Sequence, residues 1–179
     1  MTDPVATPRS NDSLDSHPAT WPEEQLLSHC KLAFSRASGP GGQNRNKVET
    51  SVQIEYLPNQ IIAAASERRT QNENRKVALQ RLRCKLAVEV RAPSQEKKSE
   101  TWNAYCRDGR IDIAESNYLW PAVLAELIDA LSSCDWNLSM AASSLETSSS
   151  QIVKVLKKYP PAFSLLNQER KLRGQKSLD

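Results

Sequence analysis

Three short segments of the chain alternate between apolar and polar residues, which is typical of strands with one buried face. They span residues 29–35, 51–57 and 60–65, and the turn signal Pro58-Asn59 between the last two predicts a β-hairpin. The residues expected on the buried face are Cys30, Leu32 and Phe34 in the first segment and Val52, Ile54 and Tyr56 in the second.

Helical spacing begins after the hairpin. From residue 72 to residue 91 apolar residues recur at roughly helical intervals, while Lys and Arg crowd the other faces, which predicts a long basic amphipathic helix. A short helix is expected near Trp21–Leu27, and Asp108-Gly109 predicts a turn followed by a short extended piece. Further helices are predicted over residues 121–133, 138–145, 149–159 and 162–171.

These elements divide the chain into four parts. Residues 1–20 are rich in Pro, Ser, Asp and Thr and are expected to form a disordered leader. Residues 21–91 combine a small antiparallel sheet with a long packed helix, which is an α+β domain. Residues 92–114 are expected to be a linker, and residues 115–179 a small all-α helical domain.

Charge is concentrated in the middle of the chain. The formal net charge of +3 divides into −3 over residues 1–34, +6 over residues 35–91 and zero over residues 92–179. A positive middle is expected of a protein that meets nucleic acid, but a solvated helix face has the same composition. Charge by itself therefore leaves both interpretations open.

No residue pattern indicates a metal site, a cofactor or a membrane segment. The four cysteines are far apart with no CxxC pair, and the two histidines add no ligand spacing, so we expect reduced cysteines, no metal and no cofactor. No stretch approaches the roughly 18 consecutive apolar residues of a membrane span. The N-terminus lacks the pattern of a secretory signal, and we expect a cytoplasmic protein.

The most informative segment is an irregular loop between the first two strands. Three of the five glycines lie within residues 39–42, interrupted only by Pro40, a density that no regular helix or strand tolerates. Gln43 follows the paired glycines, so bare backbone can approach a bulky partner while one amide is presented beside it. The flanking cations, which suit phosphate, are Arg36, Arg45 and Lys47.

This loop resembles the GGQ loop of class I peptide chain release factors and of related ribosome-rescue hydrolases. The resemblance rests on SRASGPGGQNRNKVETSV and, beyond the hairpin, on RRTQNENRKVALQRL. It covers about residues 27–91 and implies that residues 21–91 form a GGQ release-factor-like catalytic domain.

The resemblance implies hydrolysis of the ester that joins a nascent peptide to tRNA in the peptidyl transferase centre. Gly41 and Gly42 would set the backbone, and Gln43 would stabilise the developing oxyanion with its N–H and orient water with its side chain. No acid, base or nucleophile is suitably placed nearby, so the activity is expected to need a ribosome. The implied partners are large-subunit rRNA, peptidyl-tRNA and a methyltransferase acting on the Gln43 amide, and we expect a monomer. The implied RNA-binding residues are Arg36, Ser38, Arg45, Lys47, Arg69, Gln71, Asn74 and Arg75.

The chain departs from the family in two ways. Codon-reading members are longer and carry a separate domain with a stop-codon tripeptide such as Pro-x-Thr or Ser-Pro-Phe, and we expect neither here. Tail-guided rescue factors use a basic disordered C-terminus, whereas residues 92–179 are neutral and predicted to fold. We therefore expect a codon-independent, ribosome-dependent peptidyl-tRNA hydrolase that rescues stalled ribosomes.

The C-terminal helices leave an alternative open. Residues 136–159 resemble the helix-turn-helix of Fis-type DNA-binding domains, although Glu146 stands where a glycine often makes the turn. A DNA-reading second helix would present Ser149, Ser150, Gln151 and Lys154. The alternative function is thus a non-enzymatic nucleic-acid-binding or regulatory protein, and the same helices could instead only pack or bind a ribosomal protein.

Overall fold

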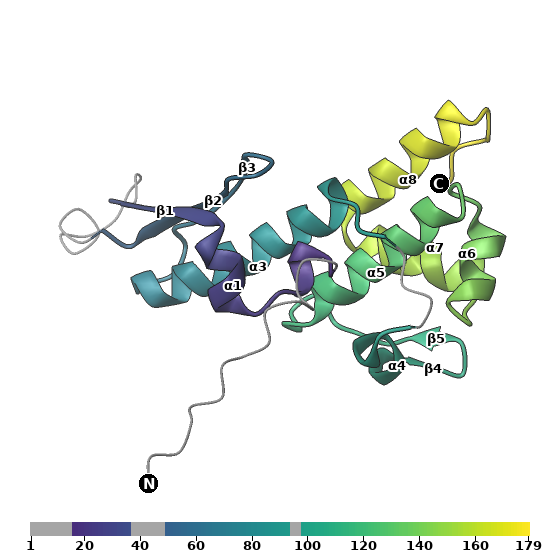
Figure 1. Ribbon diagram of the computed structural model, residues 1–179, viewed down its shortest axis with the longest axis horizontal. Coiled ribbons are helices and arrows are strands. Elements are labelled where there is room, and N and C mark those ends of the chain that lie inside the picture. Colours follow the sequence, from purple (N-terminus) through teal and green to yellow (C-terminus); the bar gives the residue numbers. More distant parts are fainter. Residues whose placement is uncertain (1–15, 37–48, 94–97) are drawn as a thin grey trace, which may run out of the picture.

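The computed structural model describes residues 16–36, 49–93 and 98–179. A small sheet lies at one end of the elongated molecule and a helical bundle at the other (Figure 1). The long helix α3 (Gln71–Glu89) runs between them and contacts both. The predicted fold class, a small antiparallel sheet with a long packed helix followed by helices, is therefore confirmed.

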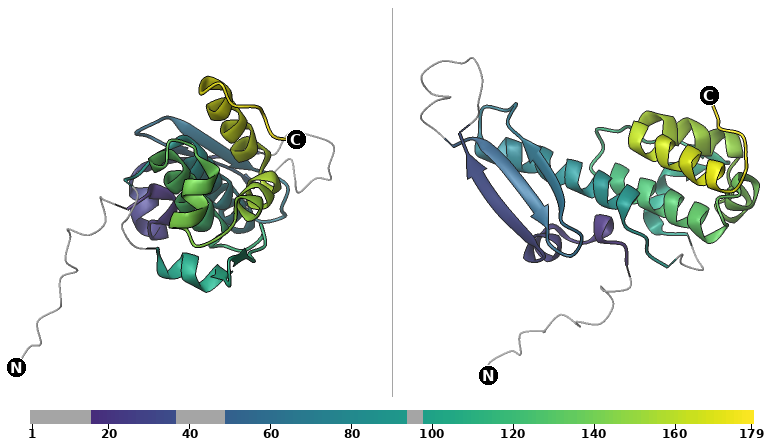
Figure 2. Two further views of the ribbon diagram at one scale, coloured as in Figure 1. Left: turned by 90° about the vertical axis from the view of Figure 1, so that its right-hand side faces the viewer. Right: turned by 90° about the horizontal axis from the view of Figure 1, so that it is seen from above.

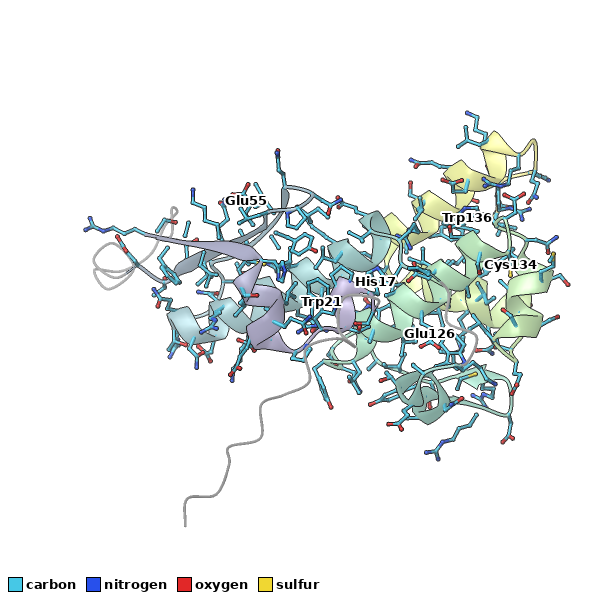
Figure 3. The ribbon with its side chains drawn as sticks, in the orientation of Figure 1. His17, Trp21, Glu55, Glu126, Cys134 and Trp136 are labelled. Carbon is cyan, nitrogen blue, oxygen red and sulfur yellow. The ribbon has the colours of Figure 1, made fainter. Side chains whose placement is uncertain are left out.

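The sheet has three antiparallel strands in the order β1-β2-β3. Val52, Ile54 and Tyr56 of β2 are buried, as alternation predicts, and Glu55 lies on the face away from α3 (Figure 3). Phe34 is 44% exposed although it was expected in the core, because α3 packs on β2 and β3 and leaves this part of β1 uncovered. The strands span Cys30–Ser35 (β1), Ser51–Tyr56 (β2) and Ile61–Ala65 (β3), so the predicted hairpin is confirmed.

Several cations of α3 bind groups of the protein itself. The Lys85 Nζ donates to the Ile62 carbonyl at 2.6 Å and the Arg81 guanidinium to the Ala64 carbonyl at 2.8 Å. Both carbonyls belong to β3, an edge strand, so these side chains satisfy groups that an exposed edge would leave unpaired. Arg83 donates to two carbonyls of the N-terminal segment at 2.6 Å each. The predicted basic face of this helix is therefore largely structural.

The N-terminal segment packs beside α3. A 3₁₀ turn, η1 (Pro18–Thr20), precedes α1 (Glu23–Ser28), which confirms the predicted short helix. His17 and Trp21 lie between the sheet end and the bundle (Figure 3), and both are buried. Residues 16–20 thus belong to the expected leader but are folded.

The acid stability of the protein is expected to depend on His17. The Ala19 N–H donates to its Nδ1 at 3.0 Å, so Nε2 carries the proton and donates to the Val90 carbonyl at 3.2 Å. Burial lowers the pKa of His17 from 6.5 to about 4, so its contribution to stability is complete above pH 6.5 and is lost as the pH falls towards 4. The loss is on the order of 3 kcal/mol.

Urea unfolding of the wild type and of His17→Gln between pH 7 and pH 4 checks this expectation. Glutamine keeps a donor and an acceptor but does not titrate, so its free energy of unfolding should fall less steeply. Burial also raises the pKa of Asp129 to about 6, which acts in the opposite direction but is present in both proteins. Parallel pH curves would contradict the assignment to His17.

The helical bundle matches the predicted segments closely. Its helices are α5 (Trp120–Ser133), α6 (Leu138–Ser144), α7 (Ser149–Lys158) and α8 (Pro160–Leu172). None of the helices in the described ranges is both long and apolar enough to cross a membrane. All four cysteines are free, and burial raises the pKa of the Cys84 thiol to about 12.

Regular structure also occurs where a linker was expected. Ser99 caps α4 (Glu100–Tyr105), and the Trp102 side chain of this helix is buried. A small hairpin of β4 (Cys106–Arg107) and β5 (Arg110–Ile111) follows, with the predicted Asp108-Gly109 turn at its tip. The division into domains remains a prediction. Helices α3 and α5 contact each other, and their buried residues belong to one hydrophobic cluster.

Candidate active site

The candidate loop joins the paired ends of β1 and β2. Ser35 lies opposite Ser51 in the register, and the sheet lies at the end of the molecule away from α6 (Figure 1). Gly41, Gly42 and Gln43 lie outside the described residues. Of the RNA-binding candidates, Ser38, Arg45 and Lys47 lie outside them as well.

Asn74 holds the end of the loop that enters β2. Its side chain is fully buried, and its Nδ2 donates to the Thr50 carbonyl at 2.7 Å and to the Arg68 carbonyl at 3.0 Å. Its Oδ1 accepts from the Arg68 N–H at 2.8 Å. A side chain with no exposed surface and three internal hydrogen bonds cannot contact RNA. The RNA contact expected of Asn74 is therefore replaced by a structural role.

The first turn of α3 adds a second contact to the loop. The Gln71 Nε2 donates to the Glu49 carbonyl at 3.0 Å, from an exposed side chain. A capping box starts the helix, in which the Thr70 hydroxyl accepts from the Glu73 N–H and the Glu73 carboxylate accepts from the Thr70 N–H, each at 3.2 Å. Hydrogen bonds from Thr70 hold the pKa of Glu73 below its usual value, so the carboxylate stays ionised.

The remaining described candidates differ in how free they are. Arg36 and Arg69 are exposed, whereas Arg75 donates to the Glu23 carboxylate at 3.0 Å across a half-exposed ion pair. Arg68, which sequence analysis did not select, is also exposed, and its backbone is fixed by Asn74. The sequence could have indicated Arg68 as a phosphate-binding candidate, because it stands directly before Arg69. Arg36 directly follows β1, and Arg68 and Arg69 lie between β3 and α3, so the exposed arginines follow strands of the same sheet.

The described residues contain no group of three or more His, Cys, Asp or Glu side chains that could hold a metal ion. The frame around the loop consists of amides, arginines and the Thr70–Glu73 capping box, in which the Thr70 hydroxyl also donates to the Glu73 carboxylate at 2.7 Å. Such groups can position a backbone and bind phosphate.

Comparison with protein families matches residues 26–117 to the RF-1 domain, slightly more than half of the chain. The chain belongs to the RF-1 domain family. The family match extends past α3, through α4 and the β4–β5 hairpin, and therefore includes the whole of the expected linker, residues 92–114.

Several curated proteins that are similar to this chain are named peptide chain release factors. The chain is 46% identical over 67 residues to the chloroplastic peptide chain release factor PrfB1 of Arabidopsis thaliana, covering 37% of this chain and 14% of the plant protein. It is 44% identical over 63 residues to peptide chain release factor 1 of Chloroherpeton thalassium, covering 35% and 17%. With peptide chain release factor 1 of Leptospira biflexa it shares 31% identity over 127 residues, covering 58% and 35%. The chain thus spans about a third or less of these relatives.

Contrary to expectation, a Pro-x-Thr tripeptide precedes the RF-1 domain. It is Pro18-Ala19-Thr20, which forms the turn η1, and its first two residues are buried. The Thr20 hydroxyl donates to the His17 carbonyl at 2.7 Å. In this arrangement Pro18 and Ala19 contribute to the core beside α3, while Thr20 is exposed.

The segment expected to resemble a helix-turn-helix, residues 136–159, is partly covered by other elements. Glu146 adopts the left-handed conformation expected at the turn (φ +51°), and the Thr147 hydroxyl donates to the Gly109 carbonyl at 2.6 Å. Gln151 accepts from the Ile111 N–H at 3.5 Å, so one expected DNA contact faces β5 instead. The turn and one side of α7 are thus occupied by the β4–β5 hairpin, and together with the release-factor relatives this does not favour the DNA-binding alternative.

Proposed function

We propose that the chain hydrolyses the ester of peptidyl-tRNA on the ribosome, through its GGQ loop and without recognising a codon. The observation that carries the proposal is membership of the RF-1 domain family together with the sequence SRASGPGGQNRNKVETSV between β1 and β2. The release-factor names of the relatives support the same chemistry.

In this mechanism the chain lends groups to a site made of RNA. Water attacks the ester carbonyl, negative charge develops on its oxygen, and the Gln43 N–H donates to that oxygen. The Gln43 side chain orients the attacking water, and Gly41 and Gly42 let the backbone approach the ester closely. Leaving-group departure restores the carbonyl and frees the tRNA hydroxyl and the peptide acid.

Arginines around the loop would bind rRNA and tRNA phosphates. Arg36 and Arg69 keep the roles expected from the sequence, and Arg68 joins them because it is exposed at the same end of the molecule. Arg75 and Gln71 already bind Glu23 and Glu49 and would contribute less. The remaining proposed RNA contacts are Ser38, Arg45 and Lys47.

Codon independence is supported by the position of the Pro-x-Thr tripeptide. Two of its residues are buried in the turn before α1, where an mRNA base cannot reach them. We also propose that the protein acts as a cytoplasmic monomer in ribosome rescue, that a methyltransferase modifies Gln43, and that the helical residues 115–179 contribute to targeting.

Peptide release from defined ribosome complexes tests the function. Ribosomes carrying labelled peptidyl-tRNA are prepared with a truncated mRNA, with a sense codon or with a stop codon in the A site, and free peptidyl-tRNA is the control. Release should not require the stop codon and should be absent without ribosomes. Release on the stop codon only would overturn codon independence, and no release from any complex would overturn the hydrolase.

A further inference from the structure

One buried amide joins two segments that frame the candidate loop. Asn74 is 24 residues from Thr50 and six from Arg68, yet it contacts the backbone of both. Thr50 is the last residue before β2, and Arg68 lies in the turn that leads to the capping box of α3. The Asn74 side chain therefore links the residue that precedes β2 to Arg68, the first of the two exposed arginines before α3.

The hydrogen-bond pattern determines how this amide is oriented. Its oxygen must face the Arg68 N–H, because that group can only donate. Its nitrogen then has two hydrogens for two carbonyl oxygens, those of Thr50 and Arg68. Both donors of the amide are satisfied inside the protein, where water does not compete.

We propose that Asn74 is a positioning residue that ties the β2 end of the GGQ loop to the Arg68–Arg69 turn. The backbone at Thr50, through which the chain enters β2, is then held to the turn before α3. Gln71 holds the residue before Thr50 as well, because its Nε2 donates to the Glu49 carbonyl. The inference rests on the proposed hydrolase function, because it assigns Asn74 an effect on that reaction.

The physical reason is that catalysis depends on the placement of the reacting groups. The chain that carries Gln43 enters β2 through Thr50, and misplacing reacting groups by about 1 Å can cost a factor of about 100 in rate. Binding of the ribosome through exposed arginines should depend much less on this hydrogen bond. Loss of Asn74 should therefore lower kcat and leave KM for the ribosome nearly unchanged.

Steady-state peptide release by Asn74→Asp and Asn74→Ala tests the proposal. Aspartate keeps the acceptor for the Arg68 N–H but removes both donors, so the hold on Thr50 is lost without a change of shape. We expect kcat to fall about 10- to 100-fold in both variants, with KM within about twofold of wild type. Unchanged kcat in folded variants would overturn the proposal.

The matched control is Gln80→Ala. Gln80 lies six residues further along the same helix and donates to the Asn117 carbonyl at 2.9 Å, so its loss removes a side-chain hydrogen bond that involves neither Thr50 nor Arg68. An equal fall in kcat in this variant would mean that general destabilisation, and not positioning, explains the effect. If the Asn74 variants fail to fold, Gln71→Ala, at an exposed position, should show the same kcat-only effect in milder form, and its absence would overturn the proposal.

Hydrogen exchange of the free protein separates this inference from the hydrolase proposal. In Asn74→Asp, amides of residues 49–51 and 68–70 should exchange faster, while those of α5 should be unchanged. If the wild type releases no peptide but exchange in Asn74→Asp rises as stated, the proposed hydrolase function is contradicted, and the role of Asn74 in holding Thr50 and Arg68 is supported. If exchange at both segments in Asn74→Asp equals that of wild type, the positioning role of Asn74 is overturned, whether or not the wild type releases peptide.

Discussion

Replacing Gln43 with alanine should slow ribosome-dependent peptide release about 100-fold. The substitution removes the side chain proposed to orient water and leaves the backbone N–H in place, so the loss comes from misplacement of the nucleophile. Gly42→Ala should be at least as severe, about 100- to 1,000-fold, because an added methyl group shifts the N–H that donates to the oxyanion. Single-turnover release from ribosomes with a truncated mRNA measures both effects.

Gln168→Ala provides a chemically identical control. Gln168 is exposed on α8, in the bundle away from the loop, so its release rate should equal that of wild type. Figure 2 shows α3 between the sheet and this bundle in a second view. Wild-type release by Gln43→Ala would remove Gln43 from the catalytic role.

The second large effect concerns the joint between α3 and the bundle. Arg91, just beyond α3, donates to the Asp129 carboxylate of α5 at 3.1 Å, and the Ala92 N–H donates to the same oxygen at 3.3 Å. Asp129 is only 7% exposed. Arg91→Met should lower the free energy of unfolding at pH 7 by about 3 kcal/mol, because a buried carboxylate would lose its cation.

The destabilisation of Arg91→Met should diminish in acid. Burial already raises the pKa of Asp129 to about 6, above its unfolded value of 3.8, and loss of the cation would raise it further. A group of this kind favours the folded state most below its unfolded pKa and least once the pH has risen through its folded pKa. Urea unfolding at pH 7 and pH 5 should therefore show a smaller difference from wild type at the lower pH.

Two variants control for the loss of the arginine side chain. Arg91→Met combined with Asp129→Leu removes both charges and should recover much of the lost stability. Arg107→Met makes the same change at an exposed position of β4 and should alter the free energy of unfolding by less than about 0.5 kcal/mol. Equal destabilisation by Arg91→Met and Arg107→Met would show that the ion pair between Arg91 and Asp129 does not stabilise the fold.

Elements with strong local signals were predicted well. The alternation over β2 placed Val52, Ile54 and Tyr56 in the core, and the ends of α5 and α8 differ from the prediction by at most two residues. Helical and strand periods of apolar residues report burial of one face directly, which explains this agreement. Pro160 and Pro161 follow the end of α7 and occupy the first turn of α8, where proline is tolerated.

Short elements and long-range contacts were not predictable in the same way. The six-residue helix α4 was assigned to a linker because its surroundings are charged, yet Trp102 is buried and donates to the Leu145 carbonyl at 3.2 Å. The cations of α3 look like a nucleic-acid surface in sequence. In the fold, Arg81, Arg83 and Lys85 bind backbone carbonyls whose positions depend on chain folding far from the helix.

The amino-acid sequence by itself determined the order of the longer helices and strands, the α+β class and the resemblance to release factors, because periodicity and the GGQ segment are local properties. Only the tertiary structure decided which polar side chains are available to a partner. Asn74 and Arg83 are committed to carbonyl groups inside the protein, whereas Arg36, Arg68 and Arg69 are exposed. That distinction depends on burial and on partners distant in sequence, since a buried polar group must find a hydrogen bond wherever the fold supplies one.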